Sequence, residues 1–566
     1  MTKYLILVLL SLCALIYSQG TDPSCQPNGI KLSLGDNFDL STQYDKEKLL
    51  KATRHDYTIT YFTKANCPKN YCEVYTSLDL KVKLTLNPVQ IKRFFQPKDT
   101  TGIAKTETRT EDFEMYIYEY QLDASILKFK PDSLISYKCF YLSDDSTPVL
   151  KDKGLFEFYH IDYSKLKERE FKFAWVADYD INPNTKYGNR QFGKDNMYIM
   201  DKYIKQERKN FVGIIAGGDY AYDLNDDSGQ RGVNFLKAAE FSYATIPYVT
   251  IAGNHEEWYN YSYYKSFFRN PRSSISESDY YTLSIGDLLL VGMNTNKYIK
   301  DPKTNQNIGI DKQWLQQLLK WFDDTMTEMK GKYRWSIVYS HQNIYCFEDF
   351  ATSACYSNPE IFSDLEDLLN KHKVDIYLAG HVHAYERIQP NYKGQPKFKQ
   401  TEQCKMKSCS LYESPEAPVY VVDGSGGTYH YFPKDSGYPG GQLTVTSDRT
   451  LGFSTVTVKN STHLVFEHIL SDSLEVFDSF TIYKPLVNEA VIEDNKQNTQ
   501  YIKENENEDE HKKMYIIFFV ILGFIAACNL VAFLWFKIKL ENKIRQKVQI
   551  RQSDTEKMAV ISTNQF

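Results

Sequence analysis

The chain has 566 residues, which is enough for two or three domains. Its 44 tyrosines raise the aromatic content to 15%, so the volume needed for a large core is available. The formal net charge of -5 lacks the basic footprint on which nucleic-acid binding depends, and we therefore expect no nucleic-acid partner.

Residues 1–20 predict a secretory signal peptide. Lys3 precedes an apolar run, and the small residues Ser18 and Gly20 follow it, so cleavage is expected after Gly20. Two Asn-X-Ser/Thr tripeptides, at Asn260 and Asn460, are possible glycan acceptors in a secreted glycoprotein.

A second apolar segment, residues 514–536, is long enough to span a bilayer as one helix. Lysines and arginines follow it, and an acidic stretch at 504–510 precedes it. Basic flanks favour the cytoplasmic side. We therefore predict a type I single-pass membrane protein with a polar stalk at 486–513 and a cytosolic tail at 537–566. Its body would be extracellular or in an endomembrane or lysosomal lumen.

Eight cysteines lie outside these segments, and an even number in a secreted body suggests disulfide bonds. They are Cys25, Cys67, Cys72, Cys139, Cys346, Cys355, Cys404 and Cys409. The short spacings of Cys346–Cys355 and Cys404–Cys409 favour local loop closures, but spacing leaves every pairing open. No C-x-x-C pair occurs, which argues against a cysteine zinc module.

The first part of the body, residues 21–165, predicts a β-sandwich. Apolar and polar residues alternate at 55–62, 77–86 and 113–122, as in antiparallel strands with one solvated face. No catalytic constellation is visible here, so we interpret the region as a structural or recognition module.

Residues 166–485 alternate between strand and helix patterns, which indicates an α/β domain with parallel pairing in its sheet. The expected strands are 171–177, 211–216, 246–251, 334–339, 374–379, 419–422 and 453–458. The expected helices are 196–209, 233–244, 314–322 and 359–372.

Five of these strands are followed by side chains that can bind metal ions. They are Asp178, Asp219 with Tyr222, Asn254, His341, and His381 with His383. Open α/β sheets bind ligands at such strand ends. Seven oxygen and nitrogen ligands exceed the shell of one ion and suit two ions with a bridging carboxylate. The glycines before Asp219, Asn254 and His381 permit tight turns.

The five motifs in this order resemble the signature of purple acid phosphatases, within the calcineurin-like metallophosphoesterases. They are Asp178-Tyr-Asp180, Gly218-Asp-Tyr-Ala-Tyr222, Gly253-Asn-His-Glu256, Val338-Tyr-Ser-His341 and Gly380-His-Val-His383. The resemblance covers about 165–485. It implies an N-terminal fibronectin III-like β-sandwich and then an α/β metallophosphoesterase domain, with β-sheets flanked by helices. One C-terminal transmembrane helix completes the expected architecture.

The resemblance also implies a binuclear metal centre, Fe(III) plus a divalent ion (Fe, Zn or Mn). Its first metal would be held by Asp178, Asp219, Tyr222 and His383. Its second metal would be held by the bridging Asp219 together with Asn254, His341 and His381. A hydroxide bound to the two metals would hydrolyse phosphate monoesters, the reaction of an acid phosphatase. His255 would contact the phosphate and protonate the leaving alcohol as a general acid.

The sequence also departs from the family pattern. Asp180 stands where the family has glycine, and this carboxylate could crowd the first metal, add a ligand or point away. The loop after His341 lacks the further histidines of larger members. Glu386 and Arg387 are structural or supporting residues. Phosphodiester or nucleotide pyrophosphate hydrolysis, and a catalytically silent surface receptor or adhesion protein, are the alternative functions.

Overall fold

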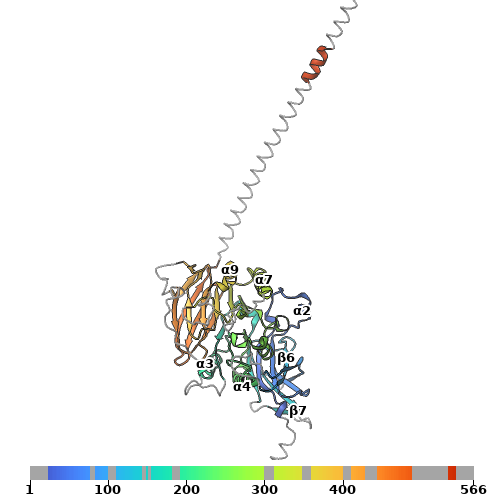
Figure 1. The fold of residues 1–566 in the computed structure, drawn as a ribbon, viewed down its shortest axis with the longest axis vertical. Coiled ribbons are helices and arrows are strands. Elements are labelled where there is room, and N and C mark those ends of the chain that lie inside the picture. Colours follow the sequence, from blue (N-terminus) through green and yellow to red (C-terminus); the bar gives the residue numbers. More distant parts are fainter. Residues whose placement is uncertain are drawn as a thin grey trace, which may run out of the picture. The chain divides into compact units, whose positions relative to one another are not determined.

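A computed structural model describes most of the chain, which divides into two compact units, Met1–Pro485 and Leu486–Phe566. The described residues are 23–76, 83–99, 110–142, 148–150, 154–181, 192–298, 312–346, 359–399, 409–427, 443–486 and 533–542. Figure 1 shows the fold, and the first unit contains every strand described below.

The expected signal peptide and most of the expected transmembrane segment lie outside the described residues. Within the second unit, the structure describes residue 486 and a helix at 533–542. Among the described residues, no helix is both long and apolar enough to cross a bilayer. The leader and the membrane anchor therefore stay predictions.

The larger sheet of the first unit has eleven strands. Their order is β20 (Leu411–Glu413), β25 (Val476–Tyr483), β24 (His463–Leu470), β23 (Gly452–Val458), β10 (Phe171–Val176), β11 (Phe211–Ala216), β12 (Tyr248–Thr250), β1 (Asn28–Leu34), β2 (Tyr57–Thr63), β6 (Phe113–Leu122) and β5 (Gln90–Gln96). Strands β10, β11 and β12 are parallel, and β1 joins β12 in parallel. This edge-to-edge contact connects the N-terminal region to the α/β region.

The second sheet has seven strands. Their order is β13 (Tyr280–Ile285), β14 (Leu288–Met293), β15 (Trp335–Tyr339), β16 (Ile376–Ala379), β21 (Val419–Asp423), β17 (Tyr385–Ile388) and β22 (Thr444–Asp448). Strands β14, β15, β16 and β21 are parallel. The pair β18 (Asn391–Tyr392) and β19 (Gln395–Pro396) forms a small separate hairpin.

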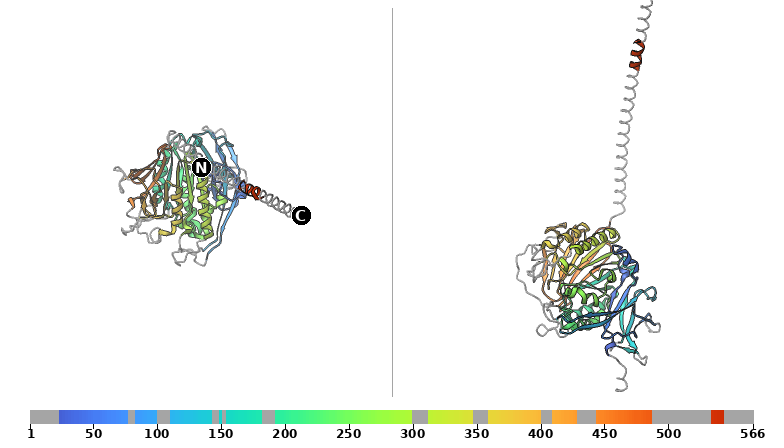
Figure 2. Two further views of the ribbon diagram at one scale, coloured as in Figure 1. Left: turned by 90° about the horizontal axis from the view of Figure 1, so that it is seen from above. Right: turned by 45° about the vertical axis from the view of Figure 1, so that its right-hand side comes forward.

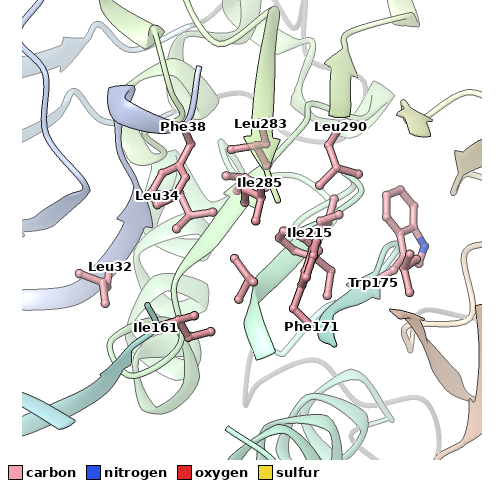
Figure 3. Close-up of a cluster of buried hydrophobic side chains, with 14 of the residues drawn as sticks. Leu32, Leu34, Phe38, Ile161, Phe171, Trp175, Ile215, Leu283, Ile285 and Leu290 are labelled. Carbon is pink, nitrogen blue, oxygen red and sulfur yellow. The ribbon is translucent and has the colours of Figure 1, made fainter. Parts of the chain in front are cut away.

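The two sheets face each other across one apolar core. Figure 3 shows Trp175 and Ile215 of the larger sheet near Leu283 and Leu290 of the second sheet. Strand β11 is apolar along its whole length because both of its faces are buried. The α/β architecture expected from the sequence is thus confirmed.

Helices cover the outer face of each sheet. Helices α3 (Phe192–Gln206) and α4 (Gln230–Tyr243) pack on the larger sheet, and α7 (Lys312–Met329) and α9 (Ser363–Lys371) on the second. Figure 2 gives two further views of this packing. In α7 the buried residues recur every three or four positions, as one apolar helix face requires.

Short helical segments lie in the connections. They are η1 (Pro23–Cys25), η2 (Asp36–Phe38), α2 (Lys46–Lys51), η3 (Tyr163–Lys165), η4 (Asp227–Gly229), η5 (Asn254–Glu256), α5 (Trp258–Phe267), α6 (Ser273–Ser276), η6 (Asn296–Tyr298) and η7 (Pro359–Phe362).

The N-terminal region contributes a further sheet, which packs against β1, β2 and β6. It contains β4 (Lys83–Leu86), β3 (Asn70–Tyr75), β7 (Ser133–Leu142) and β8 (Pro148–Leu150), with β9 (Phe156–His160) also paired to β7. The two layers share one core. Because one layer belongs to the eleven-stranded sheet, the expected division at residue 165 falls inside one compact unit.

Two disulfide bonds stabilise the N-terminal region. They join Cys25 to Cys67 and, across β3 and β7, Cys72 to Cys139. Cys346 and Cys409 are also disulfide-bonded. Their expected partners, Cys355 and Cys404, lie outside the described residues.

Candidate metal centre

The carboxyl ends of five parallel strands in the two facing sheets carry the seven predicted ligands. Asp178 follows β10, Asp219 and Tyr222 follow β11, and Asn254 begins η5 after β12. His341 follows β15 on the second sheet, and His381 and His383 follow β16. The structure brings these side chains together in two neighbouring groups.

The first group contains Asp178, Tyr222 and His383. The Tyr222 hydroxyl donates to Asp178 Oδ1 at 3.3 Å and lies 3.0 Å from His383 Nε2. His383 Nε2 is also 3.5 Å from Asp178 Oδ1. A phenol, a carboxylate and an imidazole therefore converge within the span of one coordination shell.

The second group contains Asp219, His341, His381 and Asn254. Ligand atoms of the first three lie within 4.8 Å of one another. His341 Nε2 is 3.3 Å from Asp219 Oδ2 and 3.1 Å from Asn254 Oδ1. The groups are linked through the backbone N–H of His381, which donates to Asp178 Oδ2 at 2.8 Å.

The orientation of His341 is fixed by a hydrogen bond on the far side of its ring. Nδ1 donates to the Gly217 carbonyl at 2.9 Å, which leaves Nε2 facing Asp219 and Asn254. Nε2 and two acceptor oxygens therefore meet in a buried space, where a proton or a metal ion has to lie between them. A backbone bond to the second ring nitrogen is the usual support of a metal-binding histidine.

Two of the predicted turn glycines are required for close packing rather than for an unusual backbone angle. A Cβ atom at Gly253 would lie 2.1 Å from Asp219 Oδ1, and one at Gly380 would lie 2.5 Å from Asp178 Oδ2. Gly218, by contrast, has φ +101°. Any residue larger than glycine at position 253 or 380 would therefore collide with one of the two carboxylates.

The charges of the centre are strongly coupled. Burial alone would raise the pKa of Asp219, but His341 and His255 hold it well below its usual range. Burial would lower the pKa of His341, but Asp219 raises it to about 9. Burial and the charge of His341 lower the pKa of His381, so its imidazole is neutral, the form that binds metals. A buried group with this much negative charge favours a bound cation.

His255 lies beside the two groups, with about a third of its side chain exposed. Its Nδ1 donates to Asp223 Oδ1 at 2.8 Å, and its ring centroid is 4.5 Å from that of Tyr222. Trp258 Nε1 donates to the same Asp223 oxygen at 2.9 Å. Burial would lower the pKa of His255, but Asp219 and Asp223 raise it to about 10.

Two acidic residues of the centre were missed by sequence reasoning. Asp223 orients His255, and its position directly after Tyr222 was the available signal. Glu256 accepts backbone N–H bonds from Asp219, Tyr220 and Gly253 at 2.7–2.8 Å. It therefore joins the β11 and β12 loops, and its place in the Gly253–Glu256 motif could have suggested this role.

Comparison with known families agrees with this geometry. Residues 157–385 match the family model of calcineurin-like phosphoesterases. Residues 417–479 match that of the iron/zinc purple acid phosphatase-like protein C. The chain is therefore similar to calcineurin-like phosphoesterases and to purple acid phosphatases over these two regions.

Similar proteins include acid phosphatase type 7 of Danio rerio, 26% identical over 309 residues, and that of Homo sapiens, 24% identical over 306 residues. Each match spans 52% of this chain and 66% of the relative, just under two thirds of its length. The solved purple acid phosphatase PPD1 of yellow lupin (Lupinus luteus) shares the fold, with TM-score 0.59 and 18% identity. That match covers 81% of this chain and 75% of the lupin chain.

The unusual Asp180 forms a buried ion pair. Its Oδ2 is 2.6 Å from Arg231 Nη2, which extends from α4. The carboxylate that replaces the family glycine is thus neutralised by an arginine 51 positions away. The pairing explains how the chain accommodates this extra charge beside Asp178.

Arg387 has a structural role. Its guanidinium makes two hydrogen bonds to Asp478, at 2.8 and 2.9 Å, and one to the Cys409 carbonyl at 2.6 Å. It therefore connects β17 to β25 and to the segment before β20. Glu386, next to it on β17, is buried.

Proposed function

We propose that the chain is an acid phosphatase that hydrolyses phosphate monoesters at a binuclear metal centre. The strongest support is the position of His341 Nε2, which lies 3.3 Å from Asp219 Oδ2 and 3.1 Å from Asn254 Oδ1. These three atoms have a metal ion or a proton as their only common partner, and a second set of ligands lies beside them.

The donor atoms fit the expected ions. Asp178, Tyr222 and His383, with the bridging Asp219, would hold Fe(III), because phenolate and carboxylate oxygens suit a hard trivalent ion. Asp219, Asn254, His341 and His381 would hold the divalent iron, zinc or manganese ion. When bound, such ions polarise a phosphoryl group and lower the pKa of water so that a nucleophile forms at modest pH.

His255 would act as the general acid. Its Nδ1 is bonded to Asp223, so its Nε2–H is the proton available to a leaving alcohol oxygen. Nε2 is 3.8 Å from Asp219 Oδ2, which directs this edge of the ring toward the metal centre. Asp223 and the indole of Trp258 would keep the imidazole in this orientation.

The compartment follows from the disulfide bonds, which suggest an extracellular or lumenal body. We propose that residues 514–536 anchor this body as a type I membrane protein. Phosphate esters outside the cytosol would then be the substrates.

The test is metal content and hydrolysis by the full chain in detergent. We expect two metal ions per chain and hydrolysis of an aryl phosphate at acidic pH. Asp219→Asn should reduce both, with activity falling about 100-fold or more, since changes even to the support of a ligand cost 10–100-fold. Asp324→Asn, at a partly exposed position of helix α7, is the matched control.

Two outcomes would contradict this proposal, and each would support a different function. Wild-type protein that binds no metal and hydrolyses no ester would support the receptor or adhesion function. Faster hydrolysis of an aryl phosphodiester than of the matching monoester would support a phosphodiesterase. A similar protein from Hordeum vulgare, 28% identical over 169 residues, is named nucleotide pyrophosphatase/phosphodiesterase, so a nucleotide pyrophosphate belongs in the same substrate panel.

A further inference from the structure

A polar cavity of about 640 Å³, which none of the predicted metal ligands lines, lies between the N-terminal strands and helices α5 and α6 of the first unit. Strands β2, β5 and β6 form one wall, and α5 and α6 form the other. Exposed residues at its rim, among them Gln90, Asn260 and Ser274, show that it opens to solvent. Its volume is in the range of small-ligand sites, roughly 300–1,000 Å³.

The walls are suited to a hydroxyl-rich occupant. Glutamine, asparagine, serine and threonine side chains predominate, with Tyr259 as an aromatic surface at one edge. Arg269 and Lys265 are neutralised by Glu119 and Glu277, at 2.8 and 2.7 Å. Small apolar ligands prefer apolar walls, so this cavity favours a neutral, polar ligand such as a sugar.

Lys92 is the cavity's unused donor. Arg269 and Lys265 each pair with a glutamate. For the ammonium group of Lys92, the described residues include no ion-pair or hydrogen-bond partner. Burial and the charge of Arg269 lower the pKa of Lys92. A sugar hydroxyl or acetamide oxygen in the cavity would accept its hydrogen bonds.

The acceptor tripeptide Asn260-Tyr-Ser262 borders this cavity. Asn260 is exposed, and its carboxamide has no hydrogen bond to any residue that the structure describes. Tyr259, Asn260 and Tyr261 have φ values of 53°, 57° and 60°, so a left-handed turn presents Asn260 at the rim. At the second tripeptide, Asn460 Oδ1 instead accepts bonds from the backbone N–H groups of Thr462 and His463.

We propose that Asn260 carries an N-linked glycan whose first sugars occupy this cavity. In the secretory pathway an oligosaccharide would be transferred from a lipid-linked pyrophosphate donor. A bond forms between sugar C1 and Asn260 Nδ2, the bond from C1 to the lipid pyrophosphate breaks, and Nδ2 loses one proton. The inference rests on the lumenal compartment and not on the phosphatase chemistry.

The experiment uses full-length protein from a glycosylating eukaryotic host. Mass spectrometry of peptides should find the glycan on Asn260. An amidase should release it slowly from native protein and fully after denaturation. Acetylation of Lys92 by a lysine reagent should rise several-fold in Asn260→Gln, while acetylation of Lys320, on the exposed face of α7, stays constant.

Three comparisons make the result decisive. Ser262→Thr keeps the acceptor tripeptide and should leave Lys92 protected, and Asn460→Gln should do the same. If Asn260→Gln misfolds, the acetylation of Lys92 is measured in wild-type protein before and after enzymatic removal of the glycan. An unmodified Asn260, or a modified Asn260 with equal Lys92 acetylation in every protein, would overturn the proposal.

Discussion

At the scale of single residues, the candidate metal centre contains residues in backbone conformations that their side chains do not prefer. Asp178, Asp219, Tyr222 and His381 all have positive φ, between 42° and 74°. Each such conformation costs roughly 1–3 kcal/mol and persists only where surrounding contacts offset it. The Glu256 carboxylate, which accepts from the Asp219 backbone N–H, and the Asp178 carboxylate, which accepts from the His381 backbone N–H, provide such contacts.

Replacing Tyr222 by phenylalanine tests whether the phenol binds iron. The change removes the hydroxyl that contacts Asp178 and His383 and keeps the ring. We expect loss of the visible charge-transfer absorption, with the divalent ion retained. Tyr220→Phe is the control, because that hydroxyl donates to the Ala216 carbonyl at 2.7 Å. An unchanged spectrum in Tyr222→Phe would exclude Tyr222 as a ligand.

Replacing Asp223 by asparagine tests the orientation of His255. Without the carboxylate, the imidazole loses its 2.8 Å partner and much of its positive charge. Hydrolysis of alkyl phosphates should fall about tenfold to a hundredfold, since a general acid contributes about 10²–10⁴. Hydrolysis of 4-nitrophenyl phosphate should change little, because its leaving group needs no proton. An equal loss for both esters would assign Asp223 a role in metal binding or folding.

At the scale of helices and strands, the prediction succeeded where a pattern is local. Strands β10, β11 and β15 begin within one residue of their expected starts, because continuous apolar runs mark strands buried on both faces. Candidate ligands that directly follow such strands could therefore be proposed from the sequence alone, and the structure brings them close together. Strand β12 is shorter than expected and ends at Thr250.

Contacts between distant segments were beyond sequence reasoning. The parallel pairing of β1 with β12 joins Ser33 to Tyr248, and neither segment indicates its partner. The Asp180–Arg231 ion pair depends in the same way on how α4 packs. Strand β5 was missed because exposed polar residues occupy much of an edge strand.

The buried Glu73 on β3 predicts an acid-sensitive N-terminal sheet. Burial would raise its pKa, but hydrogen bonds from Tyr75, Lys83 and Lys138 lower it to about 2. Its stabilising effect is therefore present above pH 4.5, the ordinary value, and is lost as the pH falls through about 2. Glu73→Gln should cost about 1–3 kcal/mol in the free energy of unfolding at pH 7.

The check is urea unfolding of both proteins at several pH values. The difference between wild type and Glu73→Gln should persist at pH 5 and shrink below pH 4.5. Glu114→Gln is the control, because the Glu114 carboxylate also has a low pKa, about 2, but lies at the surface in its pair with Arg93. Exposed pairs contribute little, so a comparable loss in Glu114→Gln would contradict the role of burial.

At the scale of the whole molecule, the N-terminal region and the α/β region form one compact unit. Removing residues 1–165 would expose the edge of β12 and the aromatic core that the two regions share. We expect this truncation to aggregate, because unpaired edge strands associate with other chains. Removing residues 486–566 should leave a monodisperse, active protein. Size-exclusion chromatography with an activity assay is the measurement, and an active, soluble 166–566 chain would contradict the expectation.

The continuous eleven-stranded sheet also determines how the protein would resist a mechanical load. Strand β1 lies near the beginning of the described chain and β25 at the end of the first unit, and both belong to this sheet. Tension applied between these ends would pass across the strands that carry Asp178 and Asp219. The pairing of β1 with β12 involves one residue pair, Ser33 with Tyr248, whereas β10 and β11 pair through five. Stretching the protein would therefore separate β1 from β12 first and leave the strands that carry Asp178 and Asp219 paired.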